Sequence, residues 1–112
     1  MNEYILTYLQ YILDAIEEME GFFENYPMRF ETFQHDHLRI SSVERKVEIM
    51  GEAINRIMKI DPNFLLPNAK DIINTRNRII HGYDSVTSEF LWGLVIRHIP
   101  NLKKDVTNLI SH

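Results

Sequence analysis

Apolar residues recur every three or four positions along most of this chain, and that spacing dictates helices. Over residues 4–23 the apolar positions follow alternating steps of four and three, and a second series over residues 43–57 repeats the pattern. The two series are Ile5, Leu9, Ile12, Ile16, Met19 and Phe23, and Val43, Val47, Met50, Ile54 and Ile57. Such spacing places the apolar side chains on one helix face, which has to be buried against another element.

Turn residues separate these two helices. Tyr26-Pro27 ends the first, because a residue before proline disfavours helical geometry. Phe30 and Phe33 then predict a short turn of helix. The second long helix begins near Asp36 or Ser41 and ends at Asp61-Pro62.

The last part of the chain predicts two more helices. Asn68 is a candidate N-cap for a third helix that starts near Ala69, with Asp71 at the positive end of its dipole, and Gly82 ends it. Residues 85–88 supply the next cap, and an apolar series over residues 91–109 predicts a final helix. Pro100 lies within that series and predicts a kink.

These elements predict an all-α fold. No alternating strand pattern of useful length occurs, so we expect an up-and-down bundle of four main helices plus a short extra helix. The 112 residues match the usual size of one domain, so we expect residues 1–112 to form a single domain. The chain has no cysteine, no signal-like amino terminus and no apolar run that would cross a bilayer, which makes a cytoplasmic protein the default expectation.

The charge is unevenly distributed along the chain. The net charge of −4 argues against binding of nucleic acid by bulk electrostatics. Residues 1–36, however, hold eight acids and one base, a net −7, whereas residues 37–112 hold eight acids and eleven bases, a net +3. A polyanionic substrate should therefore be met by the later helices.

Residues 76–83, RNRIIHGY, concentrate groups that handle polyanions. The guanidinium groups of Arg76 and Arg78 offer planar forks of donors that match phosphate. The segment also holds His81, and histidine as a residue type can accept or donate a proton in catalysis. Gly82 lets the backbone turn sharply after it. Such groups can supply a base for a ribose 2′-hydroxyl, an acid for the leaving oxygen and a cation for the charge on phosphorus, which is what RNA cleavage without a metal requires. The alternative is structural, because cations at a helix carboxyl end interact favourably with its dipole.

Helix geometry constrains how such a site is built. Arg76 and His81 are five positions apart, so at about 100° per residue they project about 140° apart around the helix. The long Arg76 side chain, or unwinding of the last turn at Gly82, would close this gap within one copy. Two copies of the segment that meet across a twofold axis would assemble a larger cleft more readily. We therefore predict a homodimer with the site at its interface.

The segment RNRIIHGY, with residues 85–92 after it, resembles the signature of the HepT-like toxins of the HEPN superfamily, in which an Arg and a polar residue precede a His and then a Tyr. Residues 43–53, VERKVEIMGEA, are similar to that family's recurrent segment ending in Ile-Gly-Glu-Ala. The resemblance covers nearly the whole chain. It departs from the pattern little: Arg78 stands at a variable position, and residues 33–37 have no clear match.

The resemblance implies a metal-independent endoribonuclease without a cofactor, which acts as the toxin of a type VII-like toxin–antitoxin pair. Its antitoxin would be a minimal nucleotidyltransferase of the MntA type. Carried over residue by residue, Arg76 and His81 are catalytic, whereas Asn77, Arg78 and Tyr83 are accessory. AMPylation of Tyr83 by the antitoxin would inactivate the toxin, because a bulky anion beside His81 fills the cleft and repels RNA. Family members are homodimers with the two motifs facing each other. The alternative is a helical adaptor that binds a nucleotidyltransferase and has no nuclease activity.

Other candidate residues have simpler interpretations. His35, Asp36 and His37 suggest metal ligands but form a solvated polar turn more readily. Glu48 and Glu52 form an i, i+4 pair for which solvent exposure is the simpler interpretation, although Glu48 would orient Arg76 if the helices pack closely.

Residues that carry no proposed chemistry are assigned to packing. Tyr4, Tyr8 and Tyr11 follow helical spacing that indicates core or interface packing. Phe90 and Trp92 are expected behind the turn at residues 81–82. Gly51, inside a helix, indicates close helix approach, within or between subunits.

Overall fold

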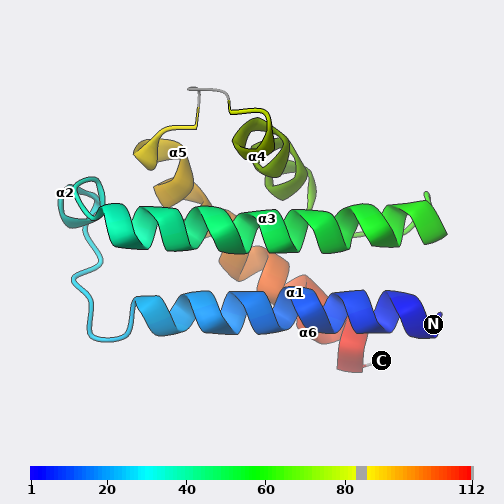
Figure 1. The fold of residues 1–112 in the computed structure, drawn as a ribbon. Helices are drawn as coiled ribbons and strands as arrows, with labels where there is room; N and C mark the ends of the chain where they lie inside the picture. Colours follow the sequence, from blue (N-terminus) through cyan, green and yellow to red (C-terminus); the bar gives the residue numbers. More distant parts are fainter. Residues whose placement is uncertain (83–85, 112) are drawn as a thin grey trace.

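The computed structural model describes residues 1–82 and 86–111, which fold into helices joined by loops (Figure 1). The helices are α1 (Glu3–Phe22), α2 (Phe30–Phe33), α3 (His37–Ile60), α4 (Lys70–Ile80), α5 (Ser88–Gly93), the π-helical turn η1 (Leu94–His98) and α6 (Ile99–Ser111). α5, η1 and α6 follow one another without a break, so four main helices and the short α2 make up the bundle. The described residues contain no strand, which confirms the all-α fold.

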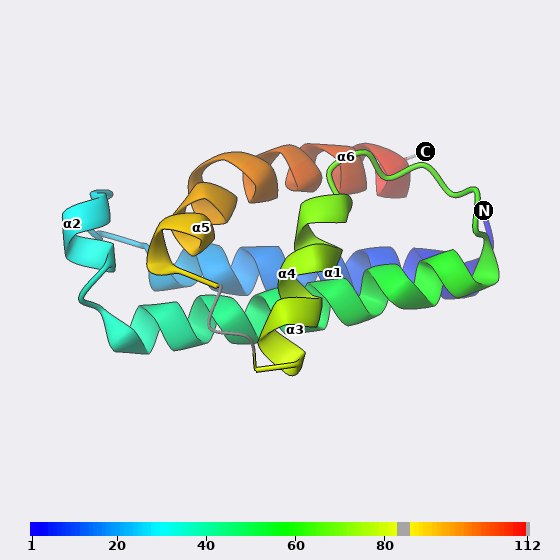
Figure 2. The same cartoon turned by 90° about the horizontal axis from the view of Figure 1, so that it is seen from above.

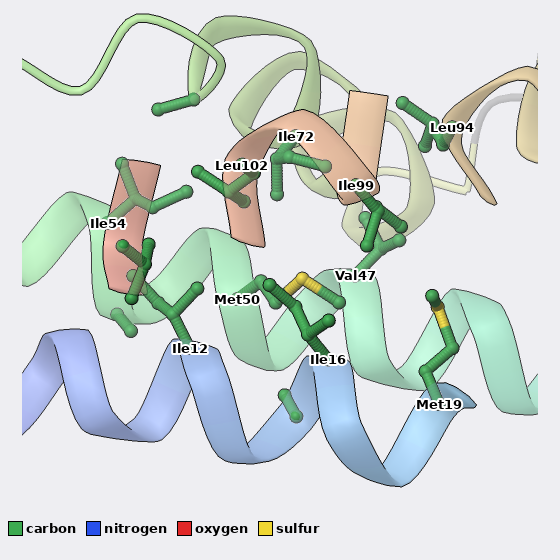
Figure 3. Close-up of a cluster of buried hydrophobic side chains, with 14 of the residues drawn as sticks. Ile12, Ile16, Met19, Val47, Met50, Ile54, Ile72, Leu94, Ile99 and Leu102 are labelled. Carbon is green, nitrogen blue, oxygen red and sulfur yellow. The ribbon is translucent and has the colours of Figure 1, made fainter. Parts of the chain in front are cut away.

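The core lies where α1 and α3 pack side by side in opposite directions (Figure 1). Figure 3 shows Ile12 and Ile16 of α1 pointing toward Ile54 and Met50 of α3, and all four side chains are fully buried. Both predicted apolar series are buried apart from Phe23, which is partly buried. The periodicity therefore identified the inner faces of both long helices correctly.

The remaining helices cover this pair. α6 packs on α1 and buries Leu102 and Val106, and α4 packs on α3 and buries Ile72. Figure 2 shows that α4 runs across α3 instead of along it. The π-helical turn η1 lies immediately before α6, whose second residue is Pro100. Because a proline ring crowds the preceding turn and offers no N–H, the irregular turn is located where the sequence predicted a kink.

The start of α4 differs from the expectation at one residue. Ala69 occupies the N-cap position, and no side chain caps the helix there. The prediction of Asn68 as the cap is wrong because its amide instead donates a hydrogen bond of 2.6 Å to the Asp105 carboxylate on α6. Asp71 does lie in the first turn of α4, as predicted, and its carboxylate is 3.2 Å from Nδ1 of His98. The loop before α4 is thus fixed by the neighbouring helix.

None of the described helices is both long enough and apolar enough to span a membrane.

An aromatic cluster attaches α2 to the bundle. The Phe33 ring is fully buried, with its centroid 5.1 Å from that of Trp92 and 6.1 Å from that of Phe23. Trp92 therefore packs against Phe23, just after α1, and Phe33 of α2. The expectation that it also lies behind residues 81–82 stays a prediction.

Truncation of this cluster should lower stability. We expect Phe33→Ala to reduce the free energy of unfolding by about 3 to 5 kcal/mol, because a large buried ring leaves a cavity. Urea denaturation followed by circular dichroism measures the change. Tyr4→Ala is the matched control, since Tyr4 is 70% exposed, and it should change stability by less than about 0.5 kcal/mol. Equal losses in the two variants would contradict the assignment of Phe33 to the core.

Candidate active site

The segment singled out in the sequence forms the carboxyl end of α4. Arg76 and Asn77 lie in the last turns of the helix, and His81 is its C-cap, with its backbone N–H bonded to the Asn77 carbonyl at 3.1 Å. Gly82 follows with φ of +68°, a left-handed conformation that disfavours other residues. The sharp turn predicted after His81 is therefore confirmed.

Arg76 lies on the side of α4 that faces α3, directly over Gly51. A Cβ built on Gly51 would lie 2.6 Å from the Cβ of Arg76 and 2.8 Å from its Cγ. No side chain is tolerated there without movement, so the glycine provides the space for the arginine stem. The close helix approach expected at Gly51 thus occurs within one chain, between α3 and α4.

Polar contacts hold the guanidinium end of Arg76. Nη2 donates a hydrogen bond of 2.7 Å to the Glu52 carboxylate, and Nη1 donates a longer one of 3.3 Å to Oδ1 of Asn77. Nε is buried without a hydrogen-bond partner among the described residues. The side chain as a whole keeps 22% of its surface exposed.

Glu52 joins two arginines. It accepts a hydrogen bond of 2.9 Å from Nε of Arg56, one turn further along α3, in addition to the bond from Arg76. The hydrogen bond from Arg56, together with the charges of Arg76 and Arg56, lowers the pKa of Glu52 below its ordinary value, so the carboxylate is ionised at neutral pH.

The acidic residue beside Arg76 is Glu52 and not Glu48. Solvent exposure was the simpler interpretation of both residues, with orientation of Arg76 by Glu48 as the alternative, and the Glu48 carboxylate instead pairs with Arg45 at 3.3 Å. Solvent exposure alone does not describe Glu52, which contacts a residue of another helix. Glu52 directly follows Gly51, so the point where α4 crosses α3 decides which carboxylate reaches Arg76.

A groove of about 580 Å³ opens beside Arg76 between α1, α3 and the end of α4. Its lining consists of Tyr8, Tyr11, Arg45, Glu48, Ile49, Glu52, Ala53, Arg56, Arg76 and Ile80. The rings of Tyr8 and Tyr11 meet edge to face with centroids 6.0 Å apart, and Tyr11 is 52% exposed. The packing predicted for these tyrosines is confirmed for Tyr8, which packs against the core, and both residues also line the groove with Arg76. Their helical spacing alone could not show which helix they face.

His81 lies apart from the lining of this groove. It is exposed at the end of α4, as are Asn77 and Arg78. Arg76 faces α3 and His81 caps the helix end, in keeping with the divergence of about 140° expected from helical geometry. Tyr83, the remaining predicted site residue, lies outside the described residues.

Asp36, one of the three residues considered as metal ligands, has another role. One oxygen of Asp36 accepts the backbone N–H of Arg39 and caps α3, and the other accepts hydrogen bonds from the Arg39 guanidinium at 2.8 Å and the Tyr26 hydroxyl at 3.0 Å. These bonds, the backbone one first, lower the pKa of Asp36. Asp36 thus anchors the start of α3. In the described part of the chain, no group of three or more His, Asp or Glu side chains is arranged to hold a metal ion.

Comparisons with known proteins agree on one family. A family model described as "Ribonuclease HepT-like" matches residues 12–109. "Putative RNase TTE0752" of Caldanaerobacter subterraneus subsp. tengcongensis is 30% identical over 110 residues, which cover 93% of this chain and 92% of that protein. "Probable ribonuclease HepT" of Thermococcus cleftensis is 36% identical over 98 residues, or 86% of each chain. "Putative RNase MJ0127" of Methanocaldococcus jannaschii is 27% identical over 104 residues, or 90% of this chain and 85% of that one. No solved structure matches the chain significantly.

The contact between Gly51 and Arg76 predicts an unusual response to alanine. Alanine normally stabilises a helix interior by about 1 kcal/mol relative to glycine. We expect Gly51→Ala to destabilise the protein instead, because overpacking costs about 1 to 3 kcal/mol and the nearest atom, the Arg76 Cβ, moves only with α4. Urea denaturation measures the difference.

Gly21→Ala is the matched control. Gly21 also lies in a helix, and a Cβ built there meets no atom within 4 Å, so this variant should be more stable than the parent. A stabilising Gly51→Ala substitution would show that the two helices are not in tight contact.

Proposed function

The chain belongs to the HepT-like ribonuclease family, and we propose that it cleaves RNA as a metal-independent endonuclease with Arg76 and His81 as its catalytic residues. The observation that carries this proposal is the placement of Arg76. Its stem packs on Gly51, its guanidinium is held by hydrogen bonds, and the residue lines an open groove. A fixed cation beside a groove is what binding of a phosphodiester requires.

The chemistry follows from the groups present. His81 removes the proton from a ribose 2′-hydroxyl, whose oxygen attacks the adjacent phosphorus and forms the new O–P bond. The bond from phosphorus to the 5′-oxygen of the next nucleotide breaks, and that oxygen takes a proton from an imidazolium. Arg76 donates to the phosphate oxygens, where negative charge builds in the transition state. The products are a 2′,3′-cyclic phosphate and a free 5′-hydroxyl.

This mechanism favours a site shared by two copies. A base and an acid are needed together, and one His81 supplies only one of them at a time. Because Arg76 faces α3 while His81 is exposed at the helix end, a second copy would bring another His81 toward the first site. We therefore propose a homodimer with paired motifs at its interface, Asn77 and Arg78 beside the reacting groups, and residues 1–112 forming one domain.

The cellular role is proposed from the same resemblance. Unregulated RNA cleavage is toxic, so we propose that the protein is the toxin of a toxin–antitoxin pair that acts in the cytoplasm, where its RNA substrate is found. Its partner would be a minimal nucleotidyltransferase that attaches AMP to Tyr83. Tyr83 is two positions after His81 in the sequence, so the adduct would add bulk and negative charge next to the catalytic imidazole.

Nuclease assays test the catalytic pair. We expect the purified protein to cut RNA in the presence of EDTA and to leave 2′,3′-cyclic phosphate ends. His81→Ala should lower the rate by about a hundredfold to ten-thousandfold, the usual contribution of a general acid or base. His35→Ala, which removes another exposed histidine, is the control and should keep full activity. Retained cleavage by His81→Ala, or loss of cleavage with EDTA, would refute the mechanism. If the wild-type protein leaves RNA intact, the result would favour the alternative function, a helical adaptor that binds a nucleotidyltransferase and has no nuclease activity.

Mass spectrometry tests the regulation. After co-expression with a cognate nucleotidyltransferase, the intact mass should rise by whole AMP units, and the modified protein should lose RNase activity because of repulsion of the substrate phosphates. Tyr83→Phe should show no added mass. Adducts that persist in Tyr83→Phe would place the modification on another residue.

A further inference from the structure

We infer that Glu52 is a positioning residue for Arg76: it fixes the guanidinium in the orientation that the phosphate needs, at some cost in RNA affinity. The inference rests on the proposed function of Arg76. Its basis is the hydrogen bond of 2.7 Å from Nη2 of Arg76 to the Glu52 carboxylate, which links α4 to α3 at the edge of the groove.

The contacts of Arg76 leave little freedom to its side chain. The stem lies over Gly51, so the first part of the side chain is fixed by backbone packing. Beyond it, Glu52 is the closest partner of the guanidinium, because the bond to Asn77 is longer at 3.3 Å. A guanidinium presents its donors in one plane, so a bond to Nη2 also sets the direction of the remaining N–H groups.

Glu52 is itself held in place from its own helix. Nε of Arg56 donates to its other carboxylate oxygen at 2.9 Å, so the two oxygens serve two different arginines. An anchor that is fixed before the substrate arrives does not have to be organised during the reaction, which is how preorganised sites gain rate.

The same carboxylate places a negative charge in a groove proposed for RNA. It is 45% exposed, so it repels a polyanion while it orients Arg76. A pair that served stability alone would have neither effect on the reaction, and partly exposed ion pairs contribute little to folding. Removal of the Glu52 charge is therefore expected to lower the rate of cleavage, because Arg76 loses its orientation, and to strengthen RNA binding, because the repulsion is lost.

Glu52→Gln is the test variant, because glutamine keeps the size of the side chain and one acceptor oxygen. We expect kcat for RNA cleavage to fall about tenfold or more, since misplacement of a catalytic group by about 1 Å costs on the order of a hundredfold. The Kd for an uncleavable 2′-deoxy substrate analogue should stay the same or become tighter, by on the order of a few-fold.

The matched control is Glu20→Gln. Glu20 also pairs with a cation of another helix, Lys103 of α6 at 2.9 Å, and is 49% exposed, but it is not part of the groove lining. Its substitution removes one carboxylate charge without touching Arg76 or the groove, so kcat should stay near the wild-type value. A Glu52→Gln protein with unchanged kcat overturns the inference. So does one in which kcat and RNA affinity fall together, because that result makes Glu52 part of the RNA-binding surface.

A measurement without RNA separates this inference from the proposed function. In nitrogen-15 NMR spectra, the Nη signals of Arg76 should be resolved in the wild-type protein, because the bond to Glu52 hinders rotation of the guanidinium. They should merge in Glu52→Gln and stay resolved in Glu20→Gln. If the wild-type protein cuts no RNA, the proposed function fails while these spectra still decide whether Glu52 fixes Arg76. Signals that are averaged in the wild-type protein overturn the inference.

Discussion

α3 packs against α1, α4 and α5, and its burial on several sides constrains the whole bundle. Its apolar positions meet α1, which sets the rotation of α3 about its own axis. That rotation turns Gly51 toward α4 and leaves Glu52 at the edge of the contact, within reach of Arg76. The chemistry of the site therefore depends on core packing: the residues that fill the α1–α3 interface determine which side chains of α3 are presented to α4.

Patterns within a short stretch of sequence predicted the helices. They did not predict contacts that depend on a segment far away in the chain. The steps of three and four identified the buried faces of α1 and α3, because periodicity reports directly on which side of a helix is apolar. Asn68 was misassigned as a cap because its partner, Asp105, lies on the last helix. The choice of Glu52 over Glu48 likewise depends on where α4 crosses α3, which no spacing within one helix reveals. Arg76 and His81 were singled out because their motif is contiguous, whereas Tyr8 and Tyr11 reach the groove from the first helix.

The structure also changes the meaning of the charge distribution. The negative charge of the first part of the chain is partly neutralised by ion pairs with other helices of the same chain. Glu18 of α1 pairs with Lys46 of α3, and Glu20 pairs with Lys103 of α6 at 2.9 Å. These lysines are therefore engaged with α1. The groove beside Arg76 is instead lined by three arginines and two glutamates, a small cationic excess. RNA binding there should involve few phosphates and depend only modestly on salt.

The π-helical turn η1 makes the helix that it interrupts sensitive to the loss of a single residue. α5 packs on α2 and α3, η1 reaches α4, and α6 packs on α1, so one continuous helix changes partners along its course. A π turn accommodates one more residue than an α turn. The apolar positions Leu91, Val95 and Ile99 accordingly step by four twice in succession before Leu102 restores a step of three. Loss of one residue from this turn would rotate the two halves of the helix relative to each other by about 100°. The extra residue of the π turn thus lets one continuous helix contact α1 through α6 and α4 through η1.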